Sequence, residues 1–237
     1  MLGRTLLLVS AMIAVGAVSG CVAPTTYGLK TDGRTPAAGE VEFTAGAAGA
    51  ASGMGNLEDD SKSFWGGGGG VTYGLTEEVA ISTSAALGTS REILDGESPN
   101  FTSFRMADAE FRWRLISEDP GAFNLTALIG AGTSIDEPRA YNRNWGAHAG
   151  MVASHRIADT ARVYYGGKLN PAIDAFYMMG SLGLTADTIT TGPVRATFGF
   201  EGFVSHASLW DEGQDEELTV KFDPAFGAGM YLNFKRH

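Results

Sequence analysis

The sequence predicts an all-β protein, an antiparallel up-and-down transmembrane β-barrel of about ten strands, with eight or twelve strands as the alternatives. Three observations lead to this prediction. Apolar and polar residues alternate with a period of two along most of the chain, the connections between these stretches differ in length in a regular way, and the N-terminus carries an export signal. Only 19% of the 237 residues are charged and 33 are glycine, a composition that disfavours a helical bundle.

The stretch 105–116 shows the alternation most clearly. Its odd-numbered residues from 107 to 115 are all apolar, and its even-numbered residues from 108 to 114 are all charged. On a strand the two sets point to opposite faces, and in a membrane barrel the apolar face contacts lipid while the charged face lines the lumen. The alternative is a soluble, lipocalin-like barrel or sandwich, but a solvated face needs more Lys and Glu than the Gly, Ser and Thr found at most polar positions.

Ten stretches of this kind follow one another. In each of them aliphatic and aromatic residues form the lipid-facing set, and Ser, Thr, Asn, Gly or a charged residue stands between them. The second stretch is dominated by glycine, and the fourth is the charged one just described. In chain order the predicted strands cover 41–47, 65–75, 79–87, 105–116, 123–131, 145–156, 163–169, 176–185, 194–201 and 226–234.

The connections between these strands alternate in length. The short ones cover 76–78, 117–121, 158–161 and 186–192, and the long ones cover 53–63, 91–100, 135–144, 171–175 and 206–224. Outer-membrane barrels have short periplasmic turns and longer outer loops, so a first strand that begins at the periplasmic side places every short turn there. An even strand number returns the C-terminus to that side. Aromatic residues around Trp65 and Trp145 at one end, and around Trp113 and Phe234 at the other, fit two membrane interfaces.

The N-terminus has the features of a secretory signal. Arg4 is the one charge in residues 1–20, and residues 5–18 form an apolar run too short for a typical spanning helix. The sequence Val18-Ser19-Gly20-Cys21 resembles the bacterial lipobox, in which the cysteine is acylated and becomes the new N-terminus. The resemblance implies a lipid anchor on Cys21. Because Val22 rather than Asp follows the cysteine, it also implies sorting to the outer membrane of a Gram-negative bacterium.

These features divide the chain into three segments. Residues 1–20 are predicted to be a lipoprotein signal peptide, residues 21–39 a lipidated flexible tether rich in Gly and Pro, and residues 40–237 the barrel. Because the anchor must sit at the inner surface of the outer membrane, we expect both termini on the periplasmic side.

The C-terminal strand adds a resemblance of its own. The residues from Gly229 to Phe234 are similar to the assembly signal of outer-membrane barrels, which implies recognition by the barrel-insertion machinery, although Lys235, Arg236 and His237 extend beyond the phenylalanine. The resemblance to small outer-membrane barrels covers residues 40–234. Outer-membrane lipid is the second expected partner. A net charge of −10 without a Lys/Arg cluster disfavours nucleic acid.

Nine charged residues fall on the predicted inward faces. They are Glu42, Asp108, Glu110, Arg112, Arg114, Arg156, Lys168, Arg195 and Glu201. One interpretation is an ion or substrate path, and the other is a structural plug in which opposite charges pair across a narrow interior. Because acids and bases are nearly balanced, the plug is the favoured hypothesis.

Other patterns point to no site. The glycine run 66–70 lacks the Lys-Ser/Thr and the helix that follow a phosphate-binding loop, and glycines in barrel strands allow curvature and close approach. The acidic stretch 205–224 is interpreted as a solvated loop, because its spacing matches no EF-hand. The four histidines, His148, His155, His206 and His237, are scattered, so neither a metal site nor a cofactor is predicted.

One short motif suggests chemistry. The sequence His206-Ala207-Ser208 is similar to the His-x-Ser of the lipid A 3-O-deacylases, small barrels that remove an acyl chain from lipopolysaccharide. The resemblance implies His206 as the base and Ser208 as the nucleophile, with Glu216 or Glu217 orienting the histidine. Trp210-Asp211 departs from that family's pattern. The leading hypothesis is a non-enzymatic barrel with a structural or surface-interaction role, and the alternatives are a membrane esterase and a small pore.

Overall fold

The chain forms a closed barrel of ten antiparallel strands, which confirms the predicted fold class. The computed structural model describes residues 31–52, 61–93, 98, 100–117, 123–137, 143–171, 175–191, 194–212 and 218–236. The strands are β1 (Val41–Ser52), β2 (Ser61–Gly74), β3 (Val79–Ile93), β4 (Asn100–Ile116), β5 (Phe123–Glu137), β6 (Arg143–Ala158), β7 (Ala161–Pro171), β8 (Ala175–Thr191), β9 (Val194–Glu212) and β10 (Leu218–Arg236). Within the described residues, no helix is long and apolar enough to cross a bilayer.

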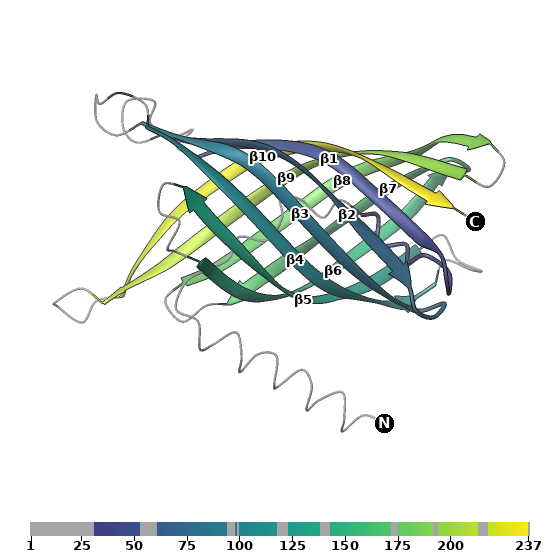
Figure 1. Cartoon of the computed structure of the whole chain (residues 1–237). Helices are drawn as coiled ribbons and strands as arrows, with labels where there is room; N and C mark the ends of the chain where they lie inside the picture. The colour runs from purple at the N-terminus through teal and green to yellow at the C-terminus, as the bar shows by residue number, and fades with distance from the viewer. Residues whose placement is uncertain are drawn as a thin grey trace, which may run out of the picture.

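Each strand pairs with its neighbours in the chain, and β1 pairs with β10 to close the barrel. The strands run obliquely around the barrel, and β10 ends beside the start of β1 (Figure 1). At this seam Val41 pairs with Arg236, and the ammonium group of Lys235 forms a salt bridge with Glu40. Closure gives every strand two hydrogen-bonded neighbours, which is the condition for a sheet in a membrane.

The outer surface is apolar and the interior is largely polar. Large side chains such as Leu87, Leu182 and Met230 are more than half exposed on the outside. By contrast, charged and hydroxyl side chains such as Glu110, Glu201 and Thr126 are buried inside. A soluble barrel would show the opposite distribution. The chain therefore has the surface of a transmembrane barrel.

The core of the barrel lies in its lumen. Inward side chains from eight of the ten strands form one apolar cluster there, made of Ala50, Leu128, Val152, Tyr164, Met179, Phe203 and Tyr231 with Ala48 and Phe64 packed against it. These residues come from β1, β2 and β5 to β10. A barrel of about ten strands encloses little more than its own inward side chains, so they contact one another across the interior.

The strands are longer than predicted at several ends. The stretch 206–224 was expected to be a loop, but β9 continues to Glu212 and β10 starts at Leu218, with Leu218 paired to Glu212. The predicted connection 186–192 belongs mostly to β8, which continues to Thr191 past an irregularity between Asp187 and Ile189. Backbone pairing continues in these places although the apolar alternation has ended, so the alternation does not mark the strand ends.

Candidate functional site in the barrel lumen

The N-terminal segment of residues 31–37 lies inside the barrel. Thr31, Asp32, Gly33 and Thr35 are buried, although the sequence predicts a flexible tether over 21–39. The structure differs from that expectation for these residues because the lumen supplies polar partners for their backbone and side chains. A Gly/Pro-rich stretch with no apolar periodicity gives no sign of such partners.

Gly33 anchors this segment. Its carbonyl oxygen accepts hydrogen bonds from Asn124 Nδ2 at 2.8 Å and from the hydroxyl of Thr126, both on β5. Gly33 has φ +77°, and a Cβ at this position would lie 3.2 Å from a methyl group of Val152 on β6. Only glycine suits this backbone conformation and this space without strain.

Two charged residues connect the segment to the wall. Asp32 accepts a hydrogen bond from the hydroxyl of Thr185 at 3.2 Å and one from Arg34 Nε at 2.7 Å. The guanidinium of Arg34 also lies 3.6 Å from a carboxylate oxygen of Asp187 on β8. Burial lowers the pKa of Arg34, but Asp32, Asp187 and Glu42 more than offset this and raise it above its ordinary value. The guanidinium therefore stays charged at any physiological pH.

A carboxylate with three basic partners occupies the middle of the lumen. The carboxylate of Glu110 on β4 accepts from Arg112 Nε at 3.0 Å, and Lys168 Nζ on β7 and His148 Nε2 on β6 lie 2.6 and 3.2 Å from its other oxygen. All four side chains are more than nine-tenths buried. We call these four residues the Glu110 cluster. It joins three strands by charge-assisted hydrogen bonds.

A second buried carboxylate has an aromatic partner. The hydroxyl of Tyr164 on β7 donates to Glu201 Oε2 on β9 at 2.8 Å. The ring of Tyr231 on β10 meets that of Tyr164 edge-on, with centroids 6.4 Å apart. Both rings belong to the apolar lumen cluster, so the polar and apolar contents of the lumen form one packed interior.

The other predicted lumen charges are not members of the Glu110 cluster. Asp108 accepts from Ser84 at 2.7 Å, and Arg195 pairs with Asp187 near the end of β8. The guanidinium of Arg114 donates to the Glu77 carbonyl in the β2–β3 turn. The remaining two differ in exposure. Glu42 is half-buried and interacts electrostatically with Arg112 and Arg34, whereas Arg156 is exposed near the end of β6.

Sequence reasoning missed several partners. Asp32 and Arg34 fall in the predicted tether, and Asp187 lies beyond the predicted end of its strand. Asp187 could have been found, because it continues the odd-numbered inward set of β8. His148 was expected to point inward but was not placed beside Glu110, since its distance from a residue on another strand depends on register.

The deacylase-like residues are only partly described. The backbone of His206 is part of β9 and pairs with Pro224 and Met178, and Ser208 pairs with Phe222 and Phe176. The side chains of His206 and Ser208 lie outside the described part of the structure, as do Glu216, Glu217 and Cys21.

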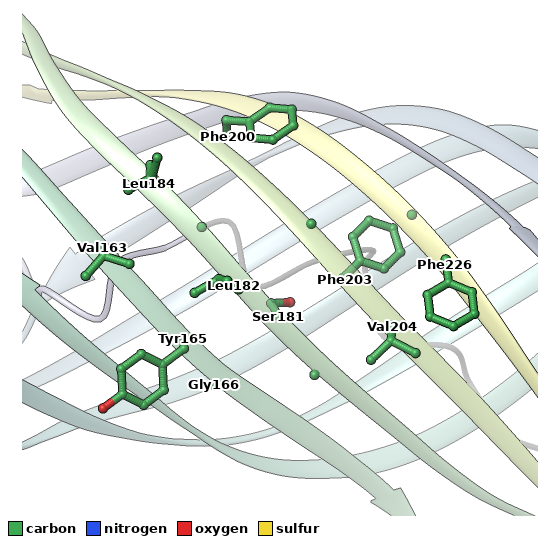
Figure 2. Close-up of a pocket in the computed structure, with 14 residues that line it drawn as sticks. Val163, Tyr165, Gly166, Ser181, Leu182, Leu184, Phe200, Phe203, Val204 and Phe226 are labelled. Carbon is green, nitrogen blue, oxygen red and sulfur yellow. The ribbon is translucent and has the colours of Figure 1, made fainter.

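The outer wall carries apolar grooves at places where glycines face outward. The largest one described, of about 1060 Å³, lies over β7 to β10 and contains Gly180 and Gly202 (Figure 2). Leu182, Val204 and Phe226 project beside them. No charged residue lines this groove, so it is suited to contact with lipid chains.

Comparison with known proteins leads to fold similarity alone. No protein-family model matches the chain, and no curated protein matches it. The outer membrane protein OprG from Pseudomonas aeruginosa is similar with a TM-score of 0.42 and 12% identity, over 86% of this chain and 99% of that chain. A FadL homologue from the same species is similar with a TM-score of 0.43 and 8% identity, over 92% of this chain and 99% of that chain. An outer-membrane channel from Pseudomonas putida F1 is similar with a TM-score of 0.40 and 13% identity, over 91% of this chain and 99% of that chain. Because all three TM-scores are below 0.5, the assignment as a membrane barrel rests on the chain's own apolar outer surface and polar lumen.

Proposed function

We propose that this chain is an outer-membrane barrel with a closed lumen, and that it has a structural or surface-interaction role rather than passing solutes. The observation that carries the proposal is the burial of residues 31–36 inside the barrel, where Asn124 and Thr126 bind the carbonyl of Gly33. A segment of the chain's own backbone held by buried hydrogen bonds occupies space that a solute would need.

Two further layers of contacts support a closed lumen. The Glu110 cluster connects β4, β6 and β7 in the interior, and the apolar cluster around Tyr164, Phe203 and Tyr231 fills space between the remaining walls. Opening a path would expose buried ion pairs and apolar side chains at the same time. Both changes cost free energy.

We also propose an N-terminal lipid anchor on Cys21 and a periplasmic position for both termini. The short β2–β3 turn, the end of β10 and the start of β1 lie together, since Gly39 and Gly74 form a backbone hydrogen bond and Val41 pairs with Arg236. The ten residues from Cys21 to Thr31 can span at most about 35 Å, which is enough to connect an acylated cysteine at the inner leaflet with the lumen entrance.

A solute-uptake assay tests the closed lumen. Full-length protein is reconstituted into liposomes, and swelling in arabinose is compared with that of empty liposomes. We expect equal rates. The folded state is verified in the same sample by a gel-mobility shift on boiling, so that a missing signal cannot come from unfolded protein. Swelling well above that of the empty liposomes would overturn the closed lumen and favour a small pore.

Palmitate labelling tests the anchor separately. We expect the unmodified chain to incorporate radioactive palmitate and Cys21→Ala to lose it while staying in the outer membrane, because the strands alone provide the apolar surface for insertion. A labelled Cys21→Ala protein would refute the anchor. A soluble periplasmic Cys21→Ala protein would refute the membrane barrel itself.

A further inference from the structure

A polar patch interrupts the apolar outer surface where β3 and β4 approach their long connection. At successive outward positions Leu87 pairs with Arg105, Thr89 with Ser103 and Arg91 with Phe101. Two guanidinium groups and two hydroxyl groups therefore share one face of two neighbouring strands. We call Thr89, Arg91, Ser103 and Arg105 the β3–β4 patch.

Aromatic residues place this patch at the level of lipid headgroups. Trp65 on β2 pairs with Thr89, and Phe101 pairs with Arg91. Both rings are about half exposed, at 48% and 58%. Exposed rings of this kind gather at the membrane–water interface, and the cost of an arginine on the lipid face falls steeply from the midplane toward that interface.

An apolar groove adjoins the patch. Its volume is about 620 Å³, and Trp65, Leu87 and Thr89 line it together with the outward glycines Gly49 and Gly67. A Cβ at Gly67 would meet a single atom within 4 Å, the carbonyl oxygen of Gly46 at 3.4 Å. The wall is therefore hollow beside Thr89, the patch residue that lines the groove, and the hollow faces the hydrocarbon layer.

We propose that the β3–β4 patch and this groove together bind one phosphorylated, acylated lipid of the leaflet at the long-loop side, with the phosphate on the patch and an acyl chain in the groove. Guanidinium groups bind phosphate oxygens through paired N–H donors, and hydroxyl groups add further donors. The proposal rests on the chain spanning a membrane, and not on the closed lumen.

The groove of Figure 2 provides an internal comparison. It has the same construction, with the outward glycines Gly180 and Gly202 between large apolar side chains, but no arginine lines it. We therefore expect it to accept hydrocarbon without selecting a headgroup, whereas the groove beside the β3–β4 patch selects a phosphate.

A binding titration followed by native mass spectrometry tests the headgroup site. Full-length protein in detergent is titrated with dioctanoyl phosphatidic acid, with dioctanoylglycerol and with inorganic phosphate. We expect the phosphatidic acid to bind and the double variant Arg91→Gln/Arg105→Gln to raise its Kd by about tenfold or more, which corresponds to the loss of about 1.4 kcal/mol. Arg156→Gln, which removes an exposed arginine at the opposite end of the barrel, should change the Kd by less than about twofold.

A second pair of variants tests the groove. Gly67→Leu fills the hollow beside the patch and should raise the Kd of the phosphatidic acid by about tenfold. Gly202→Leu is the matched control in the groove of Figure 2, since a Cβ there meets nothing closer than 3.9 Å. It should leave the affinity unchanged.

Each contrary result overturns a stated part of the proposal. Equal binding of dioctanoylglycerol, or an unchanged Kd in the double arginine variant, would remove the phosphate site. Full displacement of the probe by inorganic phosphate would show an anion site without a lipid. Every variant is first examined for its mobility shift on boiling, and Thr89→Val/Ser103→Ala replaces the arginine variant if that one does not fold. Absence of the shift in the unmodified protein would refute the membrane barrel instead.

Discussion

The ring of Tyr164 lies directly over Gly183 on the neighbouring strand, where an added Cβ would come within 2.3 Å of the ring. The two residues are register partners on β7 and β8. The arrangement recurs in the lumen at four other register pairs, namely Phe104 and Gly88, His148 and Gly130, Phe203 and Gly227, and Tyr231 and Gly199. Five inward rings thus each pack against the barrel wall over a glycine of the neighbouring strand. Any larger residue would clash with the ring, which explains why glycine occupies these inward positions.

Adding a methyl group under one of these rings should destabilise the barrel. Gly183→Ala places a Cβ inside the ring of Tyr164 and should lower the free energy of unfolding by about 1–3 kcal/mol, the usual cost of overpacking. Gly202→Ala is the control, because a Cβ there meets nothing closer than 3.9 Å. Urea titration of folded protein in lipid vesicles measures both, and equal stabilities would contradict the packing of Tyr164 on Gly183.

Replacing Glu110 should lower the stability of the barrel more than replacing any one of its partners. Glu110→Gln leaves Lys168 and Arg112 buried without a carboxylate, so unfolding should become easier by about 3–5 kcal/mol. The loss in free energy of unfolding in the double variant Glu110→Gln/Lys168→Met should be smaller than the sum of the losses in the two single variants, since it removes both charges of one pair. Additive losses in the urea titration would show that the two residues do not interact.

Thiol labelling should reveal the position of the N-terminal segment. Thr35→Cys is buried in the lumen and should react slowly with a membrane-impermeant maleimide, whereas the exposed Ala38→Cys should react fast. Adding Asn124→Leu/Thr126→Val removes both side-chain donors to Gly33 and should speed the labelling of Thr35→Cys. Equal rates for the two cysteines would place the segment outside the barrel.

The alternation of connection lengths predicts the orientation of the barrel. An epitope tag inserted between Asp211 and Glu216 should be accessible to antibody on intact cells, and a tag after His237 should become accessible only after the outer membrane is opened. The two sites lie beyond opposite ends of β10. Equal access at both sites on intact cells would contradict the proposed placement of the termini.

The barrel itself could be predicted from the sequence because its two faces contact different solvents. Residues 107–115 alternate between apolar and charged side chains, and β4 exposes Phe111 and Trp113 while it buries Glu110 and Arg112 as that alternation requires. The same period marked all ten strands. Beyond His206 the period no longer marks a strand, although the backbone of β9 pairs with β10 as far as Glu212.

The contents of the lumen could not be predicted in the same way. Which inward residues meet depends on register and on the curvature of the wall, so Glu110 could be placed inside but not beside His148 and Lys168. Residues 31–37 carry no apolar period, and their burial depends on hydrogen bonds to Asn124, Thr126 and Thr185. These hydrogen bonds depend on the three-dimensional arrangement of the closed barrel and leave no pattern in the sequence.

Single-channel recording in a planar bilayer tests the closed lumen most directly. The unmodified protein should insert without steady conductance, because residues 31–36, the Glu110 cluster and the apolar cluster occupy the interior. Asn124→Leu/Thr126→Val, which releases Gly33, should show brief openings under the same voltage, and this gives a positive control for insertion. Steady, large conductance from the unmodified protein would contradict the closed lumen and establish an open pore.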